Sequence, residues 1–212
     1  LSNSLRGDEN IVTDMGTSFT CTMQSFKTKK NQRLFTSSGI AAMGFGLPGI
    51  IGAFFANKKK IPICISGDGG LMFNLQEFQT IVNYKIPIKL FIINNGGYLT
   101  IKQTQILGFK GRIMGADKKS GLSFPNYKIL AESFGLKYFK INRVENLRKI
   151  RTLNGPTLVD IRCVEQEVIA PYQNRIRGKQ AGIHDMAPHL SVKELSGFSS
   201  VKLSFRRSNE KK

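Results

Sequence analysis

Cysteine is scarce in this chain, with only three in 212 residues. Cys21, Cys64 and Cys163 are odd in number, widely spaced and set in apolar runs. This pattern argues against a disulfide framework and against a cysteine zinc site, because both need paired or clustered cysteines. It predicts reduced, buried thiols and a cytoplasmic location.

Acidic residues are also few, since 14 Asp and Glu stand against 32 Lys and Arg, for a net charge of +18. Such a balance is typical of proteins that bind nucleic acid or anionic surfaces. The basic residues are mostly scattered, however, and residues 61–84 contain none. A solvated basic surface is therefore favoured over nucleic-acid binding. The sequence also lacks a Gly-Lys-Ser/Thr phosphate loop.

Charge is absent altogether between Arg33 and Lys58. A helix that spans a bilayer needs about 20 apolar residues. This run contains several glycines and Pro48, which would break a helix that began at Ile40. A glycine-rich loop leading into a buried helix from Leu47 to Asn57 is favoured over a membrane span.

Short apolar runs alternate with helical patterns along the chain. The strand candidates are Ile11 to Thr13, Ile61 to Ser66, Ile88 to Ile93, Tyr138 to Ile141 and Thr157 to Cys163. The helix candidates are Leu47 to Asn57, Asn74 to Tyr84, Tyr98 to Gln105, Tyr127 to Phe134 and Val144 to Leu153. This alternation predicts an α/β fold: a three-layer, doubly wound, mainly parallel sheet with helices on both faces.

Three regions are expected along the chain. No secretory signal opens the sequence, so residues 1–10 are interpreted as a lead-in from a missing upstream part. Residues 11–171 would form one domain. Residues 172–212 would be a basic extension, with nine Lys or Arg against three acidic residues. A non-catalytic module that binds an acidic partner or nucleic acid through this extension stays open as an alternative, although the extension lacks the interleaved aromatic residues of nucleic-acid platforms.

Two polar signatures follow neighbouring apolar runs. Gly67-Asp68-Gly69 ends one run and Asn94-Asn95 ends the next, 27 residues apart from Asp68 to Asn95. Asn74, placed as an N-cap with Glu77 as its partner, favours an intervening helix over a hairpin. A strand, helix, strand crossover of this length brings the two strand ends side by side.

Those two strand ends suit a metal ion and a phosphate group. The backbone at Gly67, Gly69 and Gly70 can turn tightly and donate amides to phosphate oxygens. Asp68 offers a carboxylate and Asn95 an amide oxygen. With one backbone carbonyl, phosphate oxygens and water, these ligands match the octahedral preference of Mg²⁺.

These signatures resemble the thiamine diphosphate-binding motif of the acetolactate synthase and pyruvate decarboxylase superfamily. The segment from Thr36 to Pro48 resembles the stretch that precedes the motif in acetolactate synthases, and Ile11 to Gly16 resembles the strand that opens the same domain. Three segments in register make the resemblance strong. It covers Ile11 to Pro171, which would be the C-terminal, diphosphate-binding domain.

The resemblance implies a role for each matching residue. Asp68, the side chain of Asn95 and the backbone carbonyl of Gly97 would bind Mg²⁺. The residues that face the diphosphate would be Gly69, Gly70 and Leu71.

Three further positions follow from the same resemblance. Met43 would wedge beneath thiamine diphosphate and force its two rings into a V. Thr17 and Ser18 lie where the family often places further phosphate contacts, although the local sequence departs from the usual one. The segment from Ile106 to Gly121 is interpreted either as a mobile loop or as an ordinary surface connection.

The implied reaction is decarboxylation of a 2-oxo acid such as pyruvate, followed by transfer or release of the aldehyde unit. In this superfamily a proton-relay glutamate belongs to a separate pyrimidine-binding domain, and nothing in this chain resembles that domain. The chain is therefore expected to hold half of an active site. The other half would come from an upstream part or a separate subunit, within a homo-oligomer such as a dimer or tetramer.

Overall fold

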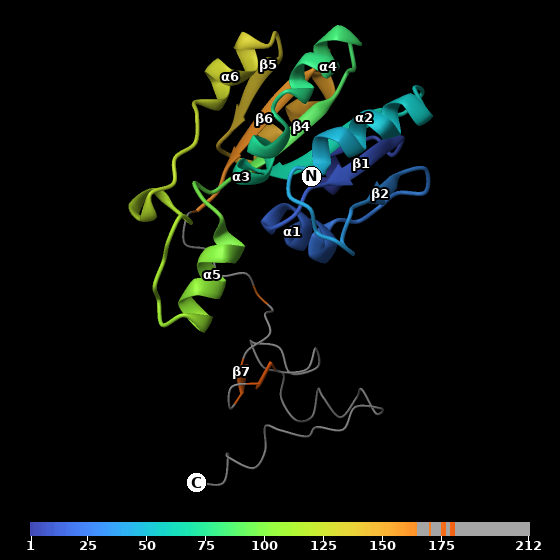
Figure 1. Cartoon of the computed structure of the whole chain (residues 1–212). Helices are drawn as coiled ribbons and strands as arrows, with labels where there is room; N and C mark the ends of the chain where they lie inside the picture. Colours follow the sequence, from blue (N-terminus) through green and yellow to red (C-terminus); the bar gives the residue numbers. More distant parts are fainter. Residues whose placement is uncertain (165–169, 171–174, 177–178, 181–212) are drawn as a thin grey trace, which may run out of the picture. The chain divides into compact units, whose positions relative to one another are not determined.

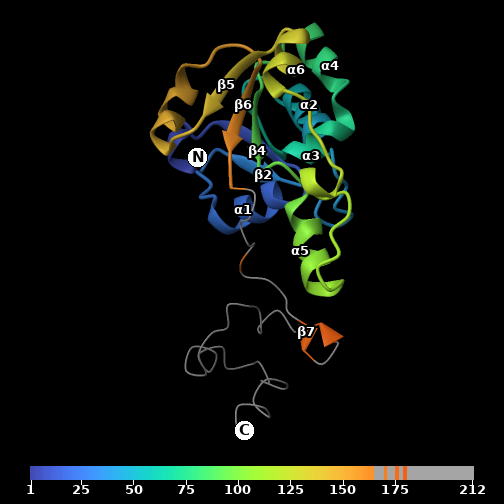
Figure 2. The ribbon, with the colours of Figure 1, turned by 90° about the vertical axis from the view of Figure 1, so that its left-hand side faces the viewer.

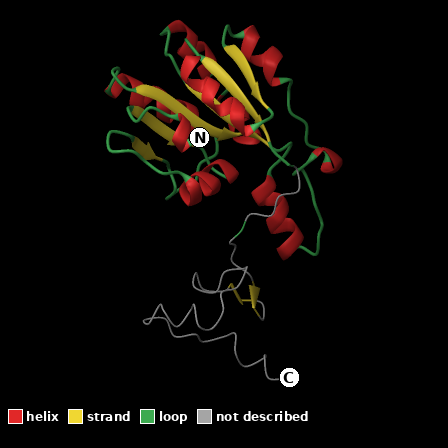
Figure 3. Cartoon of the chain, turned by 180° about the vertical axis from the view of Figure 1, so that it is seen from behind, coloured by secondary structure: helices red, strands yellow, loops and turns green. Residues whose placement is uncertain are grey.

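The computed structural model describes residues 1–164, 170, 175–176 and 179–180. The chain divides into two units, Leu1–Glu167 and Val168–Lys212. The first unit contains a six-stranded sheet in the order β2-β1-β3-β4-β6-β5 (Figure 1). Its strands are β1 (Glu9–Thr13), β2 (Arg33–Phe35), β3 (Ile61–Gly67), β4 (Lys89–Asn94), β5 (Lys137–Ile141) and β6 (Thr157–Arg162). All five strand pairs are parallel, and Figure 3 shows the strands running in a common direction, so the predicted α/β fold is confirmed.

The helices of this unit connect the strands. The α-helices are α1 (Thr17–Ser25), α2 (Gly46–Ala56), α3 (Asp68–Leu71), α4 (Glu77–Asn83), α5 (Leu99–Gly108) and α6 (Tyr127–Ser133). The 3-10 helices are η1 (Ser2–Ser4), η2 (Met72–Asn74), η3 (Lys118–Ser120) and η4 (Val144–Thr152).

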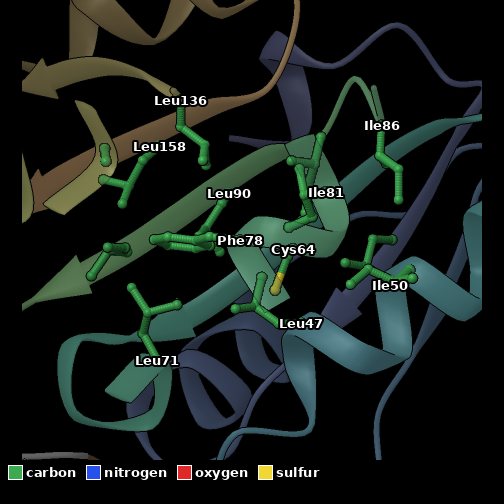
Figure 4. Close-up of a cluster of buried hydrophobic side chains, with 14 of the residues drawn as sticks. Leu47, Ile50, Cys64, Leu71, Phe78, Ile81, Ile86, Leu90, Leu136 and Leu158 are labelled. Atoms are coloured by element: carbon green, nitrogen blue, oxygen red, sulfur yellow. The ribbon is translucent and has the colours of Figure 1, made fainter. Parts of the chain in front are cut away.

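One face of the sheet is covered by α2, α4 and α6 (Figure 2). Phe78 and Ile81 of α4 lie over Leu90 of β4, and Leu47 of α2 lies beside Cys64 of β3 (Figure 4). These side chains are almost completely buried. Because β3 and β4 are central strands with helices over them, they need the near-continuous apolar runs that the sequence shows.

The second face is covered by η1, α1 and η4. Ile63 and Ile65 of β3 lie beneath these elements with Phe91 of β4, and Leu5 and Ile150 pack onto them from the covering segments. The result is a second buried apolar cluster, which makes the three layers of the predicted architecture.

The order of the strands creates a topological switch point. After β1 the chain moves outward to the edge strand β2, whereas after β3 it moves the opposite way to β4. The two connections therefore leave a crevice at the carboxyl ends of β1 and β3, which is where open α/β sheets bind ligands. Helix α5 lies beyond the same ends of the strands (Figures 1 and 2).

Helix α1 and strand β2 are among the elements that were not predicted from the sequence. Helix α1 has the sequence Thr-Ser-Phe-Thr-Cys-Thr-Met-Gln-Ser, which carries no regular apolar stripe, and it starts after Gly16 in a positive-φ conformation. Strand β2 has three residues and lies at the sheet edge, where half-exposed residues give little strand signal. Cys21 lies on α1 and is exposed, so its expected burial was wrong.

Several predicted boundaries also change. Gln76, not Asn74, precedes α4, so the predicted N-cap was wrong. The helix predicted from Val144 to Leu153 is present as the 3-10 helix η4, Val144–Thr152. Helix α5 continues to Gly108, which shortens the connection expected from Ile106 to Gly121. Among the described residues, no helix has the length and apolar character needed to cross a membrane.

In the second unit the structure describes only the antiparallel pair β7 (Arg175–Ile176) and β8 (Lys179–Gln180), besides Ala170. The expected basic extension therefore lies largely outside the described residues. The predicted limits of the three regions stay predictions.

Candidate functional site

A cavity of about 360 Å³ lies at the switch point, at the carboxyl ends of four adjacent strands. Each of the segments that follow β1, β2, β3 and β4 contributes to its wall. Among the predicted site residues, those that line it are Thr17, Met43, Gly67, Asp68, Gly69, Gly70 and Gly97. Residues from distant parts of the sequence are thus brought to one place by the parallel sheet.

Asp68 begins α3 directly after β3 and is 2% exposed. Its Oδ1 accepts a hydrogen bond from the Gly69 amide at 2.8 Å, and its Oδ2 accepts one from the Gly96 amide at 2.6 Å. The second bond joins the two signature segments. Burial raises the pKa of Asp68 to about 6, although the surrounding backbone amides act in the opposite direction. The carboxylate is therefore short of a compensating positive charge, which a bound cation would supply.

The two asparagines of the second signature have different partners. Asn94 Nδ2 donates to Asp160 Oδ1 on β6 at 3.0 Å, so this residue ties β4 to its neighbour. Asn95 Oδ1 accepts from the Gly97 amide at 3.2 Å within the turn that follows β4. Asn95 and Gly97 line a small hollow of about 10 Å³ that Lys102 also reaches. The amide oxygen of Asn95 is thus held at the turn where the sequence predicts a metal ligand.

The glycines after β3 are needed for close approach. A Cβ on Gly69 would lie 2.1 Å from the ring of Tyr98, and a Cβ on Gly70 would lie 2.6 Å from Asp14 Oδ2. A Cβ on Gly67, by contrast, would meet no atom within 4 Å. Sequence reasoning assigned no role to Tyr98 or Asp14, although an aromatic residue directly after the second signature was a usable signal for Tyr98.

Met43 lines the cavity from the glycine-rich segment after β2. Its neighbour Gly44 has a φ of 86°, which favours glycine, and is fixed at both backbone groups. The Gly44 amide donates to Asp14 Oδ1 at 2.9 Å, and its carbonyl accepts from Asn74 Nδ2 at 2.8 Å. Asn74, expected to cap α4, thus anchors the segment that carries Met43.

Asp14 is the centre of this arrangement. It is 1% exposed, and its Oδ1 accepts from the Met15 and Gly44 amides while Oδ2 accepts from Ser66 Oγ at 2.8 Å. Burial raises the pKa of Asp14 above its ordinary value, and the hydrogen bonds oppose this. One side chain therefore links the ends of β1 and β3 to the Met43 segment.

Three predicted site residues do not line the cavity of about 360 Å³: Asn95, which lines the small hollow described above, Ser18 and Leu71. Ser18 is fully buried and its Oγ donates to the Met15 carbonyl at 2.9 Å. Leu71 is 1% exposed and belongs to the apolar core under α2 and α4. Thr17, by contrast, lies in the wall.

The connection after α5 folds back onto the second signature. The Tyr98 amide donates to the Ala116 carbonyl at 2.9 Å, and Gly97 pairs with Asp117 in an isolated β-bridge. Lys102 Nζ lies 2.7 Å from Asp117 Oδ2, and this partner holds the pKa of Asp117 down to about 2. A Cβ on Gly97 would lie 2.3 Å from the Ala116 carbonyl oxygen, so glycine is required for this contact.

The chemistry of the site fits a magnesium ion that is shared with a phosphorylated ligand. Among the described residues there is no group of three His, Cys, Asp or Glu that would form an all-protein metal cage. One carboxylate at Asp68, with amide and carbonyl oxygens at Asn95 and Gly97, would leave several positions for phosphate oxygens and water. Mg²⁺ prefers such a partly open arrangement.

Comparison with known proteins agrees with this geometry. Residues 14–161 match the family model described as thiamine pyrophosphate enzyme, C-terminal TPP binding domain. The acetolactate synthase large subunit of Porphyra purpurea is 36% identical over 174 residues, which are 80% of this chain and 29% of that protein. The corresponding subunit of Lactococcus lactis subsp. lactis is 33% identical over 172 residues, 78% of this chain and 29% of that protein. Isozyme 1 of Escherichia coli is 32% identical over 170 residues, 77% of this chain and 30% of that protein. The chain thus spans less than a third of the length of these relatives.

Proposed function

Because the chain belongs to the family of C-terminal TPP-binding domains of thiamine pyrophosphate enzymes, we propose that it binds thiamine diphosphate together with Mg²⁺. Asp68, the side chain of Asn95 and the carbonyl of Gly97 would hold the metal ion. Gly69 and Gly70 would face the diphosphate, and Met43 would support the cofactor from the segment that follows β2.

The hydrogen bond from the Gly96 amide to Asp68 Oδ2, 2.6 Å long, carries this proposal. It places the one carboxylate of the cavity against the turn that bears Asn95 and Gly97. The raised pKa of Asp68 supports the same role, since a buried carboxylate without a cation nearby gains from binding one.

The geometry favours some of the expected cofactor contacts over others. Thr17 and Gly67 line the cavity and are retained in the proposal as contacts. Ser18 and Leu71 would act indirectly: Ser18 by holding the start of α1, and Leu71 by anchoring α3 in the core.

The proposed reaction is decarboxylation of a 2-oxo acid with transfer or release of the aldehyde unit, in a reducing cytoplasm. When bound, the cofactor supplies the carbanion chemistry that this step needs. The residues of this chain would bind and orient it and exclude water beneath it. The named function of the relatives, acetolactate synthase, favours a carboligase.

The active site would be completed by a pyrimidine-binding domain that provides the proton-relay glutamate. That domain would belong to a further part of the same polypeptide or to another subunit of a homo-oligomer. The short span of this chain relative to the large subunits that it resembles supports this division. Mixing the chain with thiamine diphosphate, Mg²⁺ and pyruvate should release no carbon dioxide above background, and robust turnover would contradict the half-site proposal.

Cofactor binding is tested with Asp68→Asn, and Asp8→Asn serves as the matched control because Asp8 is exposed and precedes the amino end of β1. Calorimetric titration with thiamine diphosphate should show binding that requires Mg²⁺. Asp68→Asn should weaken it at least tenfold, and Asp8→Asn less than twofold. Absence of Mg²⁺-dependent binding in the unaltered chain, or equal affinity in both variants, would refute the assignment.

A further inference from the structure

A further cavity, of about 190 Å³ and lined by both apolar and charged residues, lies at the opposite, amino-terminal end of the strands. Glu9, Ile61 and Lys89 begin β1, β3 and β4, and all three line it. The seven residues of β3 separate this end from the switch point by about 20 Å, at roughly 3.3 Å per residue. The cavity is therefore separate from the proposed cofactor site.

Lys89 is the unusual group in this cavity. It is 6% exposed, and its Nζ donates to the Gly155 carbonyl at 2.5 Å. Within the part of the chain that the structure describes, no carboxylate lies within ion-pair distance of it. Buried ammonium groups are ordinarily paired, because removing a charge from water is costly. Burial and, to a smaller extent, the charge of Lys137 on the edge strand β5, two strands away, lower the pKa of Lys89 to about 8.

Glu9 does not provide the missing negative partner. Its carboxylate accepts hydrogen bonds from the Arg6 amide at 2.6 Å, the Gly7 amide at 2.9 Å and Gln32 Nε2 at 2.6 Å. Burial acts to raise the pKa of Glu9, but these donors hold it below its ordinary value. The Glu9 carboxylate is thus satisfied by neutral donors from the approach to β1 and from Gln32, which precedes β2. It lies on β1, two strands away from Lys89.

Two arginines add positive charge to the same wall. Arg6 Nη2 donates to the Arg151 carbonyl at 3.4 Å, and Arg151 Nε donates to the Ser4 carbonyl at 2.8 Å. Both guanidinium groups are bound to neutral carbonyl oxygens, so neither charge is compensated by these bonds. The cavity therefore has three cations on its wall and one carboxylate whose acceptor positions are already occupied by neutral donors.

We propose that this cavity is a binding site for a small oxyanion, a carboxylate or phosphate group, held by the ammonium group of Lys89. The anion would accept the ammonium hydrogens that the Gly155 carbonyl leaves unused, and it would lie in the positive field of Arg6 and Arg151. A volume of about 190 Å³ is below the range of about 300–1,000 Å³ for drug-sized ligands, so a group of only a few atoms is indicated.

The test is titration of the 212-residue chain with inorganic phosphate and, separately, with acetate at constant ionic strength, followed by backbone amide chemical shifts. We expect saturable shifts centred on Lys89 and Gly155. Saturation with phosphate alone would identify a phosphate ligand, and saturation with acetate alone a carboxylate. Saturation with both would support an oxyanion site of broader specificity.

The matched variants are Lys89→Met, which keeps the apolar stem, and Lys137→Met, which removes an exposed lysine from the edge strand β5, two strands away. Lys89→Met should weaken binding at least tenfold, and Lys137→Met less than twofold. Shifts that do not saturate, that lie elsewhere or that persist unchanged in Lys89→Met would overturn the proposal. If Lys89→Met does not fold, the position of the shifts in the unaltered chain decides the question alone.

Discussion

The Asp14 network makes a sharp prediction about stability. Asp14→Ala would leave three buried donors, the Met15 amide, the Gly44 amide and Ser66 Oγ, without their acceptor. A buried donor without a partner costs about 1–3 kcal/mol. Water that enters the space left by the carboxylate can accept some of these hydrogen bonds. We therefore expect the free energy of unfolding to fall by about 2–4 kcal/mol.

The matched variant is Asp14→Asn. Its amide oxygen can still accept from the Met15 and Gly44 amides, and its NH₂ group can donate to Ser66 Oγ. Ser66 Oγ already lies 3.1 Å from the Gly67 carbonyl and can donate there instead. The expected loss is therefore below about 1 kcal/mol, the usual net contribution of one hydrogen bond.

The assay is urea and thermal unfolding of both variants and the unaltered chain at pH 7. A loss of about 2–4 kcal/mol in Asp14→Ala should lower the melting temperature by about 5–15 °C for a domain of this size. Equal losses in the two variants would refute the reasoning, because the charge rather than hydrogen-bond acceptance would then matter. No loss in Asp14→Ala would refute it as well.

Comparison of Asp14→Asn with the unaltered chain also predicts a pH dependence of stability. Burial raises the pKa of Asp14, so its contribution to stability is fully present below the unfolded pKa and is lost as pH rises through the folded pKa. The amide introduced by Asp14→Asn does not titrate. The stability of Asp14→Asn relative to the unaltered chain should therefore improve as pH is raised from about 4, near the unfolded pKa of an aspartate, to neutrality. A difference that stays constant with pH would contradict the buried carboxyl assignment.

Three further predictions concern the wall of the cofactor site and its supports. Gly69→Ala should displace the Tyr98 ring, which lies 2.1 Å from the added Cβ, and weaken Mg²⁺-dependent cofactor binding in calorimetry. Gly52→Ala, in an exposed helical position with open space, should instead stabilise the chain by about 0.5–1 kcal/mol in urea unfolding and leave cofactor affinity unchanged. Lys102→Met should lower the free energy of unfolding by no more than about 1 kcal/mol, because it removes only a partly exposed ion pair. Asp117→Ala should lower it more, because it also removes the N-cap of η3. Equal effects of Lys102→Met and Asp117→Ala in thermal unfolding would count against the capping role.

The interior strands could be predicted because burial on both faces leaves a clear sequence pattern. β3 and β4 are runs of apolar residues bounded by glycine, proline or polar residues, and the predicted ranges differ from the observed ones by one residue at each altered end. Edge strand β2 and helix α1 lack such a pattern, since neither buries a continuous apolar face. The order of the strands depends on tertiary packing and could not be derived from local sequence.

For the candidate site, the two signatures indicated which residues lie close together, but not which hydrogen bonds keep them in place. Asp68, Gly97 and Met43 line one cavity, and their roles there stay predictions. The supports of that cavity were missed because their partners are distant in sequence: Asp14 bonds to Ser66, 52 positions away. Lys89 was missed for another reason. The apolar run that contains Lys89 predicts a strand and nothing more. A lysine in a strand that is expected to be buried is itself unusual, and this was a usable signal for a buried ammonium group.

Gly70 shows why the cavity tolerates so little change. A side chain there would meet Asp14 Oδ2 at 2.6 Å, so the same glycine that would face the proposed diphosphate also leaves room for the carboxylate that fixes Gly44. Gly44 in turn precedes the helix α2 and directly follows Met43, which also lines the cavity. A substitution at Gly70 should therefore disturb both the proposed diphosphate contacts and the segment that carries Met43. A substitution at Gly67, where an added Cβ would meet no atom within 4 Å, should leave the Met43 segment intact.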